Sequence, residues 1–490
     1  FGSRLAFRPK GLADGAVRAM SLTKSAQRVL RSRAAATCAR WAGHGVFRTV
    51  CGRGQAQGAW IVASCRSHAT ARTCASASSL DKLSTFEPTD GKLAFAGSST
   101  PALLLTCGLL ELCRQRLLVD LGTRVLGWAV RPGRGPVGSA LLWLVRRTTF
   151  RHFCGGETLQ ECVRTSRQLA AGGNVRCIVD WSTEEEEDES AWDGNAERKV
   201  ETLRLSAEAL GSNAAFVPLK LTALASPKLL EQVTAAIVAG EQDPLACLQG
   251  EDRERWDAAL ARLRRLCSAA RECQISLLLD AEQSGRQPAV HLIARQLQRE
   301  FNRDTAIVYD TLQMYLKAAP GRLDEALAAA RAGGYTCAVK LVRGAYMEQE
   351  VPLGVVHSSK ADTDAAYDAA AVRLLSCVAG GETKAAVMLA THNRSSLVKA
   401  TTMMDSLGVT RNHQGVHFAQ ILGMVDNLTN SLGLAGYNAA KLVVFGRVEE
   451  VLPWLLRRLA ENRDAFGAQA LELPVLRQEL RRRLLGGGRA

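Results

Sequence analysis

The chain has 490 residues, of which 47% are hydrophobic, so it is long enough for two or three average domains or for one large barrel with appendages. Its formal net charge of +14 would suit a nucleic-acid-binding protein. However, the first 80 positions hold thirteen of the 62 basic residues and one of the 48 acidic residues, so the other 410 residues are nearly neutral. We therefore expect no nucleic-acid partner.

Residues 1–80 are predicted to form a leader. They are rich in Arg, Ala and Ser and poor in acids, and residues 20–33 are compatible with a helix, which is typical of an organellar transit peptide. A disordered basic tail without a targeting role is the alternative.

Residues 81–154 are predicted to form a helical N-terminal region. The apolar segment 101–145 is interrupted by Glu111, Arg114, Arg116 and Asp120, so it indicates amphipathic helices that pack on a core or lie on a membrane surface. No uninterrupted apolar run reaches about 18 residues, and we expect no transmembrane helix.

The segment 155–475 alternates short β-rich runs with stretches of helical periodicity, and 476–490 is expected to be a basic tail. Eight such units predict a (β/α)8 TIM-type barrel with an N-terminal helical appendage. A doubly wound open sheet is the alternative. The strands are expected at Val175–Asp180, Ala214–Leu221, Gln274–Asp280, Thr305–Asp310, Thr336–Val342, Ala385–Ala390, Gln414–Phe418 and Ala440–Val444.

The glycines at 133, 135 and 138 match the G-x-G-x-x-G pattern of dinucleotide-binding folds. That pattern requires a returning strand within about 30 residues. The residues that follow indicate a helix instead, which disfavours a dinucleotide-binding fold.

Ionisable and amide side chains follow most of the predicted strands. Because the active site of a parallel barrel lies at the carboxyl ends of its strands, these residues are candidates for a shared site. Cations that face inward need an anionic ligand or partner. The candidates are Asp180, Lys220, Asp280, Glu282, Gln313, Arg343, Tyr346, His392, Asn393 and Gln420.

Arg457 and Arg458 lie on the last predicted helix, with Glu461 four and three residues further on. This spacing is typical of a helical ion pair. The adjacent arginines could instead clamp a substrate carboxylate.

Seven motifs in register resemble the proline dehydrogenase family in its mitochondrial eukaryotic form. Together they span about 155–462. The motifs are KLTAL (220–224), LLLDAEQ (277–283), QMYLK (313–317), KLVRGAYMEQE (340–350), THN (391–393), QILGMVD (420–426) and LLRRLAEN (455–462).

The resemblance implies a (β/α)8 flavoenzyme that binds FAD and oxidises L-proline to Δ1-pyrroline-5-carboxylate. It also implies a quinone acceptor and peripheral association with the inner mitochondrial membrane. Asp280 and Lys340 would be the catalytic residues, with Asp280 beside the cations that hold the substrate. The substrate would meet Lys220, Tyr346, Leu422, Leu442, Arg457 and Arg458. The cofactor would meet Ala281, Gln313, Lys340, Arg343, Ala345, Tyr346, Met347, Thr391, His392 and Glu461.

Two positions depart from the pattern of many family members. Lys340 stands where bacterial members usually have Arg, and Leu442 stands where many members have Tyr facing the substrate ring. Because Leu442 lacks the hydroxyl, we expect poorer affinity for proline or some acceptance of 4-hydroxyproline. Other possibilities are a metal-dependent barrel hydrolase using Asp180, Asp280, Glu282 and His392, and a membrane-surface scaffold without turnover.

Overall fold

The computed structural model describes residues 86, 88–113, 115–129, 135–181, 186, 188–464 and 466–486, all within one unit that spans Cys74–Ala490. The predicted leader, 1–80, lies outside the described residues. The side chains of 113, 116–119, 123, 129 and 457–471 are also outside the described part.

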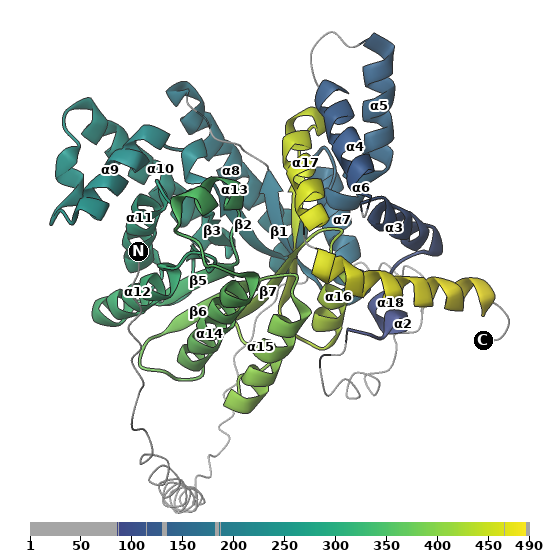
Figure 1. Cartoon of the computed structure of the whole chain (residues 1–490). Helices are drawn as coiled ribbons and strands as arrows, with labels where there is room; N and C mark the ends of the chain where they lie inside the picture. The colour runs from purple at the N-terminus through teal and green to yellow at the C-terminus, as the bar shows by residue number, and fades with distance from the viewer. Residues whose placement is uncertain are drawn as a thin grey trace, which may run out of the picture. The chain divides into compact units, whose positions relative to one another are not determined.

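Eight parallel strands close into a barrel in sequence order (Figure 1). The closure is made by β1 and β8, which pair from Arg176 opposite Ala440 to Trp181 opposite Phe445. The predicted (β/α)8 barrel is therefore confirmed, and the open sheet is excluded. The strands are β1 Arg176–Trp181, β2 Ala214–Leu219, β3 Ser276–Leu279, β4 Val308–Gln313, β5 Cys337–Val342, β6 Ala385–Ala390, β7 Val416–Ile421 and β8 Ala439–Phe445.

Helices connect the strands on the outside of the barrel, as Figure 1 shows. Their apolar sides pack against outward-facing strand residues such as Val179, Val217 and Leu277, which are fully buried. The connecting helices are α8 Glu189–Leu210, α9 Pro227–Ala239, α10 Glu251–Cys273, α11 Gln287–Phe301, α12 Ala319–Gly333, α13 Met347–Glu350, α14 Lys360–Val378, α15 Arg394–Leu407 and α16 Asp426–Leu434. Before β1 comes α7 Leu159–Gly173, and after β8 come α17 Val448–Asp464 and α18 Phe466–Leu485.

The barrel interior is filled unevenly. Large interior side chains come from the first four strands, among them Phe216 and Tyr309, whereas β5 to β8 contribute mainly alanines such as Ala338 and Ala440. Side chains alternate between the two faces of a strand. Leu278 and Ala338 face the interior. Asp280 and Lys340 each follow one of them by two residues, so they face the interior as well.

Two strands run three residues further than predicted. β4 was expected to end at Asp310 and β7 at Phe418, yet they end at Gln313 and Ile421. The additional polar residues remain in the barrel because their hydrogen bonds are satisfied there. Thr311 Oγ1 donates to the Leu279 carbonyl at 2.6 Å, and Gln420 Nε2 donates to the Thr391 carbonyl at 3.1 Å.

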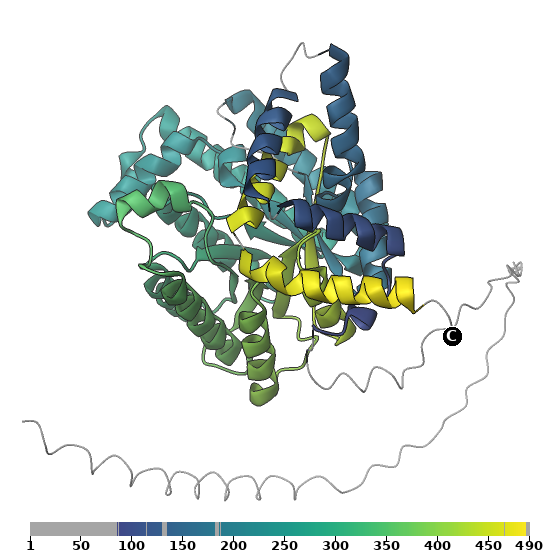
Figure 2. The ribbon, with the colours of Figure 1, turned by 45° about the vertical axis from the view of Figure 1, so that its right-hand side comes forward.

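Within the part of the chain that the structure describes, the helices before α7 are α2 Gly91–Ala94, α3 Thr100–Cys113, α4 Arg116–Ala129, α5 Gly135–Arg147 and α6 Thr149–Phe153. Leu103 and Leu110 of α3 share a buried cluster with Leu476 and Leu480 of α18. Figure 2 shows α3 and α18 alongside each other. The expected boundary at 475 thus falls inside a packed helix. The G-x-G-x-x-G match begins outside the described residues, and its last glycines belong to α5.

Candidate functional site

The ion pair between Lys340 and Asp280 occupies the barrel interior at the carboxyl ends of β5 and β3. Lys340 Nζ lies 2.6 Å from Asp280 Oδ1. The Lys340 side chain is 12% exposed and that of Asp280 is 39% exposed, so the carboxylate is the more accessible partner. The Lys340 ammonium, which would be costly to bury alone, is thereby neutralised by Asp280 at an open end of the barrel.

Asp180, at the end of β1, is held by a buried lysine from α8. Lys199 Nζ donates to Asp180 Oδ1 at 2.9 Å and to the carbonyls of Trp181 and Pro218 at 2.8 and 3.0 Å. The Lys199 side chain is 3% exposed. Burial raises the pKa of Asp180, and the Lys199 ammonium opposes this rise. Lys199 therefore joins the β1 and β2 ends beneath the site.

A set of hydrogen bonds connects the ends of β3, β4 and β5. Gln313 Nε2 donates to the Glu282 carbonyl at 3.0 Å, and Gln313 Oε1 accepts from the Ala345 N–H at 3.1 Å. The Tyr346 hydroxyl donates to the Ala281 carbonyl at 3.1 Å. Four of the predicted cofactor residues are thus brought together in one framework. Met347 begins α13 and is half exposed.

The Glu282 carboxyl is fully buried beside this framework. Its Oε1 accepts from the Thr222 hydroxyl at 2.9 Å, and its Oε2 has no hydrogen-bond partner in the structure. Burial raises the pKa of Glu282, although the positive charge of Lys220 acts in the opposite direction. Lys220, which directly follows β2, is therefore electrostatically linked to the site.

The turn after β5 has no room for a side chain at Gly344. Its φ is 153°, and a Cβ atom there would lie 2.1 Å from the Tyr315 ring. The Tyr315 hydroxyl donates to Glu350 Oε2, and Glu350 Oε1 accepts from the Ser284 N–H at 2.5 Å. Tyr315 and Glu350 therefore tie the turn of β5 to the loop that follows β3.

Arg343 lies at the rim between β5 and β6 and uses its whole guanidinium group. It donates to Asp364 at 2.6 Å, to the Thr391 hydroxyl at 2.6 Å and to the Ser396 hydroxyl at 2.9 Å. Its guanidinium carbon also lies 4.4 Å from the centre of the Tyr367 ring. Arg343 and Thr391, both predicted cofactor residues, are thus in contact, and α14 and α15 fix the position of the arginine.

The opposite rim is formed by β6, β7 and β8. His392 Nε2 accepts the Ile421 N–H at 3.1 Å, and the Leu422 N–H donates to the Leu442 carbonyl at 3.2 Å. Leu442 is half-buried and faces the barrel interior, whereas Leu422 is buried. Leu422 and Leu442, two of the three side chains predicted to surround the substrate ring, are thus joined by a backbone hydrogen bond.

A buried ionic cluster underlies this rim and was missed in the sequence. Lys441 is 0% exposed, and its Nζ lies 2.8 Å from Asp426 Oδ1. It also donates to the carbonyls of Ile421 and Met424 at 3.0 and 2.5 Å. The sequence did contain one indication of this cluster, which is a lysine inside the apolar run of β8. Because its neighbours Ala440 and Leu442 face the interior, Lys441 faces the surrounding helices, where a buried charge requires a partner.

Glu472 of α18 completes this cluster. Its two oxygens accept the N–H groups of Val425 and Asp426, each at 2.8 Å. Val425 has a φ of 47°, which is rare for a β-branched residue, and the Glu472 bond helps to hold it. Burial, followed by the nearby Asp426, raises the pKa of Glu472 to about 7. Burial acts to raise the pKa of Asp426 too, but Lys441 and His152 outweigh it, so that pKa is lowered.

Three predicted site residues, Arg457, Arg458 and Glu461, lie on α17, whose backbone is helical from Val448 to Asp464. Their side chains lie outside the described part of the structure. Their roles remain predictions.

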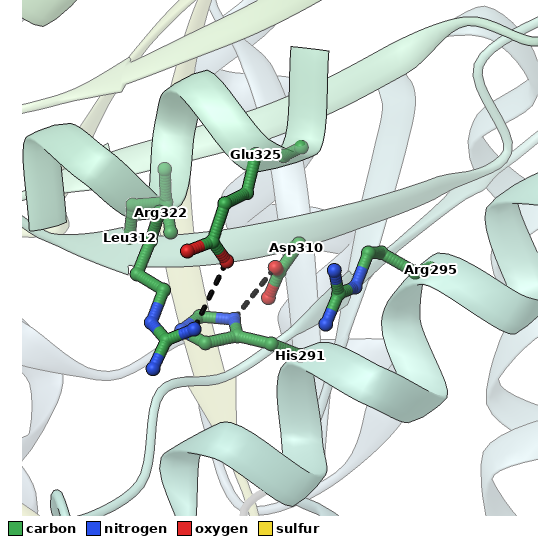
Figure 3. Close-up of a pocket in the computed structure, with 7 residues that line it drawn as sticks. His291, Arg295, Asp310, Leu312, Arg322 and Glu325 are labelled. Carbon is green, nitrogen blue, oxygen red and sulfur yellow. Dashed lines mark hydrogen bonds and ion pairs between the residues drawn. The ribbon is translucent and has the colours of Figure 1, made fainter. Parts of the chain in front are cut away.

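The pocket shown in Figure 3 is lined by residues of α11, β4 and α12 and contains none of the predicted site residues. His291 Nδ1 lies 2.7 Å from Asp310 Oδ2, and Arg322 pairs with Glu325 at 2.9 Å. Asp310 alternates with the inward-facing Tyr309 and therefore points toward the helices. The predicted site residues whose side chains are described lie outside this pocket.

The four residues considered for a metal-dependent hydrolase have other partners. Asp180 binds Lys199, and Asp280 binds Lys340. Glu282 accepts the Thr222 hydroxyl, and His392 accepts a backbone N–H. Within the described ranges, no group of three or more His, Cys, Asp or Glu residues is arranged to hold a metal ion.

The arrangement described above is that of a (β/α)8 protein whose ionic site lies at the carboxyl ends of the strands. The family model described as "Proline dehydrogenase" matches residues 162–469. The chain belongs to the proline dehydrogenase family.

Individual relatives agree with this assignment. The hydroxyproline dehydrogenase of Rattus norvegicus is 32% identical over 431 residues, which cover 80% of this chain and 93% of the relative. Proline dehydrogenase 1, mitochondrial, of Arabidopsis thaliana is 30% identical over 428 residues, which cover 80% and 85%.

A crystal structure of proline utilization A from Bdellovibrio bacteriovorus has the same fold. Its TM-score is 0.57 at 20% sequence identity, and the match covers 67% of this chain and 34% of that chain. This chain therefore spans about a third of the length of that larger protein, and the likeness is one of fold.

Proposed function

We propose that this chain oxidises L-proline to Δ1-pyrroline-5-carboxylate with FAD as its cofactor and passes the electrons to quinone. The observation that carries the proposal is the Lys340–Asp280 pair, 2.6 Å apart at the barrel mouth of a member of this family. A neutralised ion pair at an open strand end provides both a donor and an accessible carboxylate.

The residues present fit a flavin. The Lys340 ammonium has three donors, and Asp280 occupies one of them. Gln283 follows Glu282 after β3, and its buried Oε1 has no hydrogen-bond partner in the structure. Gln313, Arg343, Ala345, Tyr346, Met347, Thr391, His392 and Glu461 would also contact the cofactor, as would Ala281. FAD would supply the site that accepts a hydride, which carries two electrons, from the substrate.

The protein's own contribution is to position the substrate. Lys220, Arg457 and Arg458 would bind the carboxylate of proline, while Tyr346, Leu422 and Leu442 would surround its ring. Fixing the carboxylate restricts the orientation of the ring and removes the entropic cost of alignment. Positive charge nearby also favours the deprotonated amine, which is the form that can lose hydride.

Asp280 has a different role from the cations. Its carboxylate holds the Lys340 ammonium and partly offsets the positive charge of the site. Both groups are therefore fixed before substrate arrives, which favours catalysis because no rearrangement is needed. We assign Asp280 and Lys340 as the catalytic residues of this chain.

A second candidate function is the oxidation of 4-hydroxyproline. Leu442 faces the barrel interior at the position where many family members have tyrosine, and leucine leaves more space there. One relative that matches most of this chain is named hydroxyproline dehydrogenase. Comparing kcat/KM for the two substrates decides between the candidates.

We further propose a mitochondrial location, with the leader 1–80 as transit peptide and peripheral contact with the inner membrane. The basic, acid-poor composition of residues 1–80 supports this, and an Arabidopsis thaliana relative is named as mitochondrial. Import of the full chain into isolated mitochondria, followed by sequencing of the mature N-terminus, tests this location.

The proposed reaction is tested by variants of the ion pair. Lys340→Met and Asp280→Asn are each expected to lower kcat for L-proline by about 100-fold, in the range typical of losing a positioned electrostatic group. Lys228→Met on the exposed surface of α9 is the matched control and should leave kcat unchanged. If Lys340→Met turns over proline as fast as the control, this assignment of the site is wrong.

A further inference from the structure

Helices α3, α4 and α5 carry an unusual concentration of exposed apolar side chains. Figures 1 and 2 show the three helices on one flank of the barrel, and α3 and α4 contact α18 and α17 respectively. Trp128 and Trp143 are 44% and 54% exposed, and they are the tryptophans that stand out as exposed among the described side chains. The other exposed apolar residues here are Leu104, Leu105, Leu112, Leu121, Val137 and Leu144.

On α3 the exposed side is a continuous apolar stripe. Leu103 and Leu110 pack inward, whereas Pro101, Leu104, Leu105, Gly108 and Leu112 are exposed at helical spacing. The acidic residue of α3, Glu111, is not part of the stripe, because it pairs with Arg477 of α18. A helix that is apolar on both sides is normally buried on both sides.

On α5 the same arrangement recurs. Gly138, Leu142 and Val145 face the protein, while Val137, Ala140, Trp143 and Leu144 are exposed. Arg147 is exposed as well, and its guanidinium lies 4.7 Å from the centre of the Trp143 ring. Tryptophan and arginine side by side are typical of the boundary between lipid tails and headgroups.

The exposed charged side chains on α3, α4 and α5 indicate which kind of surface these helices bind. The exposed charged residues described on the three helices are Arg124 and Arg147, whereas Glu111 and Asp120 are half-buried and have partners. A symmetric contact between two copies would offer these arginines no exposed acidic partner on the described side chains of the same three helices. An anionic lipid surface complements them.

The length of the helices defines how they would meet a bilayer. α3 and α4 have 14 residues and α5 has 13, which corresponds to about 20 Å each at 1.5 Å per residue. The hydrocarbon core is about 30 Å thick. None of the helices in the described part of the chain is long and apolar enough to cross a membrane.

We propose that the exposed faces of α3 and α5, bordered by Trp128 and Trp143, lie flat in the headgroup region of an anionic membrane. Leu104, Leu105, Val137 and Leu144 insert among the acyl chains, and Arg124 and Arg147 meet the lipid phosphates. This inference deepens the membrane association proposed above by naming its surface. It places α17, which contacts α4, next to the membrane.

The test is co-sedimentation of the full-length flavoprotein with vesicles of phosphatidylcholine containing 30% phosphatidylglycerol. The double variant Leu104→Glu/Leu144→Glu should bind at least tenfold more weakly than the unmodified protein. Val238→Glu, at a 73% exposed position on α9, is the matched control and should bind like the unmodified protein. Vesicles of phosphatidylcholine alone should bind less of every form.

Three results would overturn the inference: no binding to anionic vesicles, binding that is unaffected by the double variant, or a dimer in lipid-free solution that the double variant dissociates. The last result would identify a second copy of the chain as the occupant. Reduction of the flavin by L-proline is measured separately on the same preparations, so the reaction and the membrane surface can each fail alone.

Discussion

Replacing Lys441 by methionine should strongly destabilise the protein. The Lys441 side chain is fully buried, and its ammonium satisfies the carbonyls of Ile421 and Met424 as well as the Asp426 carboxylate. Methionine preserves most of the volume, but it leaves the half-buried Asp426 carboxylate without its cation and the two carbonyls without their donor. Loss of one partner of a buried ion pair costs about 3–5 kcal/mol.

The assay is urea denaturation of the variant and the unmodified protein, followed by far-ultraviolet circular dichroism. A second variant, Lys441→Met/Asp426→Asn, removes both charges and should recover at least about 1 kcal/mol relative to the single variant, because the Asp426 charge is removed together with its cation. A loss below about 1 kcal/mol for Lys441→Met would refute the reasoning. So would a double variant as unstable as the sum of its two single changes.

Three further predictions concern the site and its surroundings. The pKa of Glu472 is about 7, above its ordinary value of 4.5. Its favourable contribution to the free energy of unfolding is therefore complete below about pH 4.5 and is lost as the pH rises through 7. Urea denaturation from pH 5 to 8 should therefore show a fall in stability that Glu472→Gln lessens; parallel curves would contradict this. Leu442→Tyr should increase the kcat/KM preference for L-proline over 4-hydroxyproline by about tenfold, and an unchanged ratio would rule out that role. Arg343→Lys should raise the Kd for FAD about tenfold in equilibrium dialysis, because lysine cannot hold Asp364, Thr391 and Ser396 together; unchanged affinity would show that the fork is dispensable.

The barrel was predictable because its signals are local. Each apolar run and each stretch of helical periodicity can be recognised in a short window of the sequence. Eight such pairs in succession predict parallel strands with crossover helices. Strand ends were less predictable. Thr311, Gln313 and Gln420 resemble loop residues in the sequence, but each has a hydrogen-bond partner inside the barrel.

The candidate site was predictable only in part. The family resemblance indicated Lys340 as a site residue, and the structure places it against Asp280. In contrast, the cluster of Lys441, Asp426 and Glu472 joins residues from β8, α16 and α18. Such a contact depends on how α18 packs, and no sequence spacing encodes it.

The central claim is that proline gives its electrons to a flavin held at the strand ends beside Lys340 and Asp280. The most direct test is to add L-proline to the purified flavoprotein without oxygen while recording the flavin absorbance. We predict that the visible absorbance band of the oxidised flavin is bleached by L-proline in the unmodified protein and is bleached about 100-fold more slowly in Lys340→Met. A flavin that keeps its colour in the unmodified protein at saturating L-proline and 4-hydroxyproline would contradict the claim.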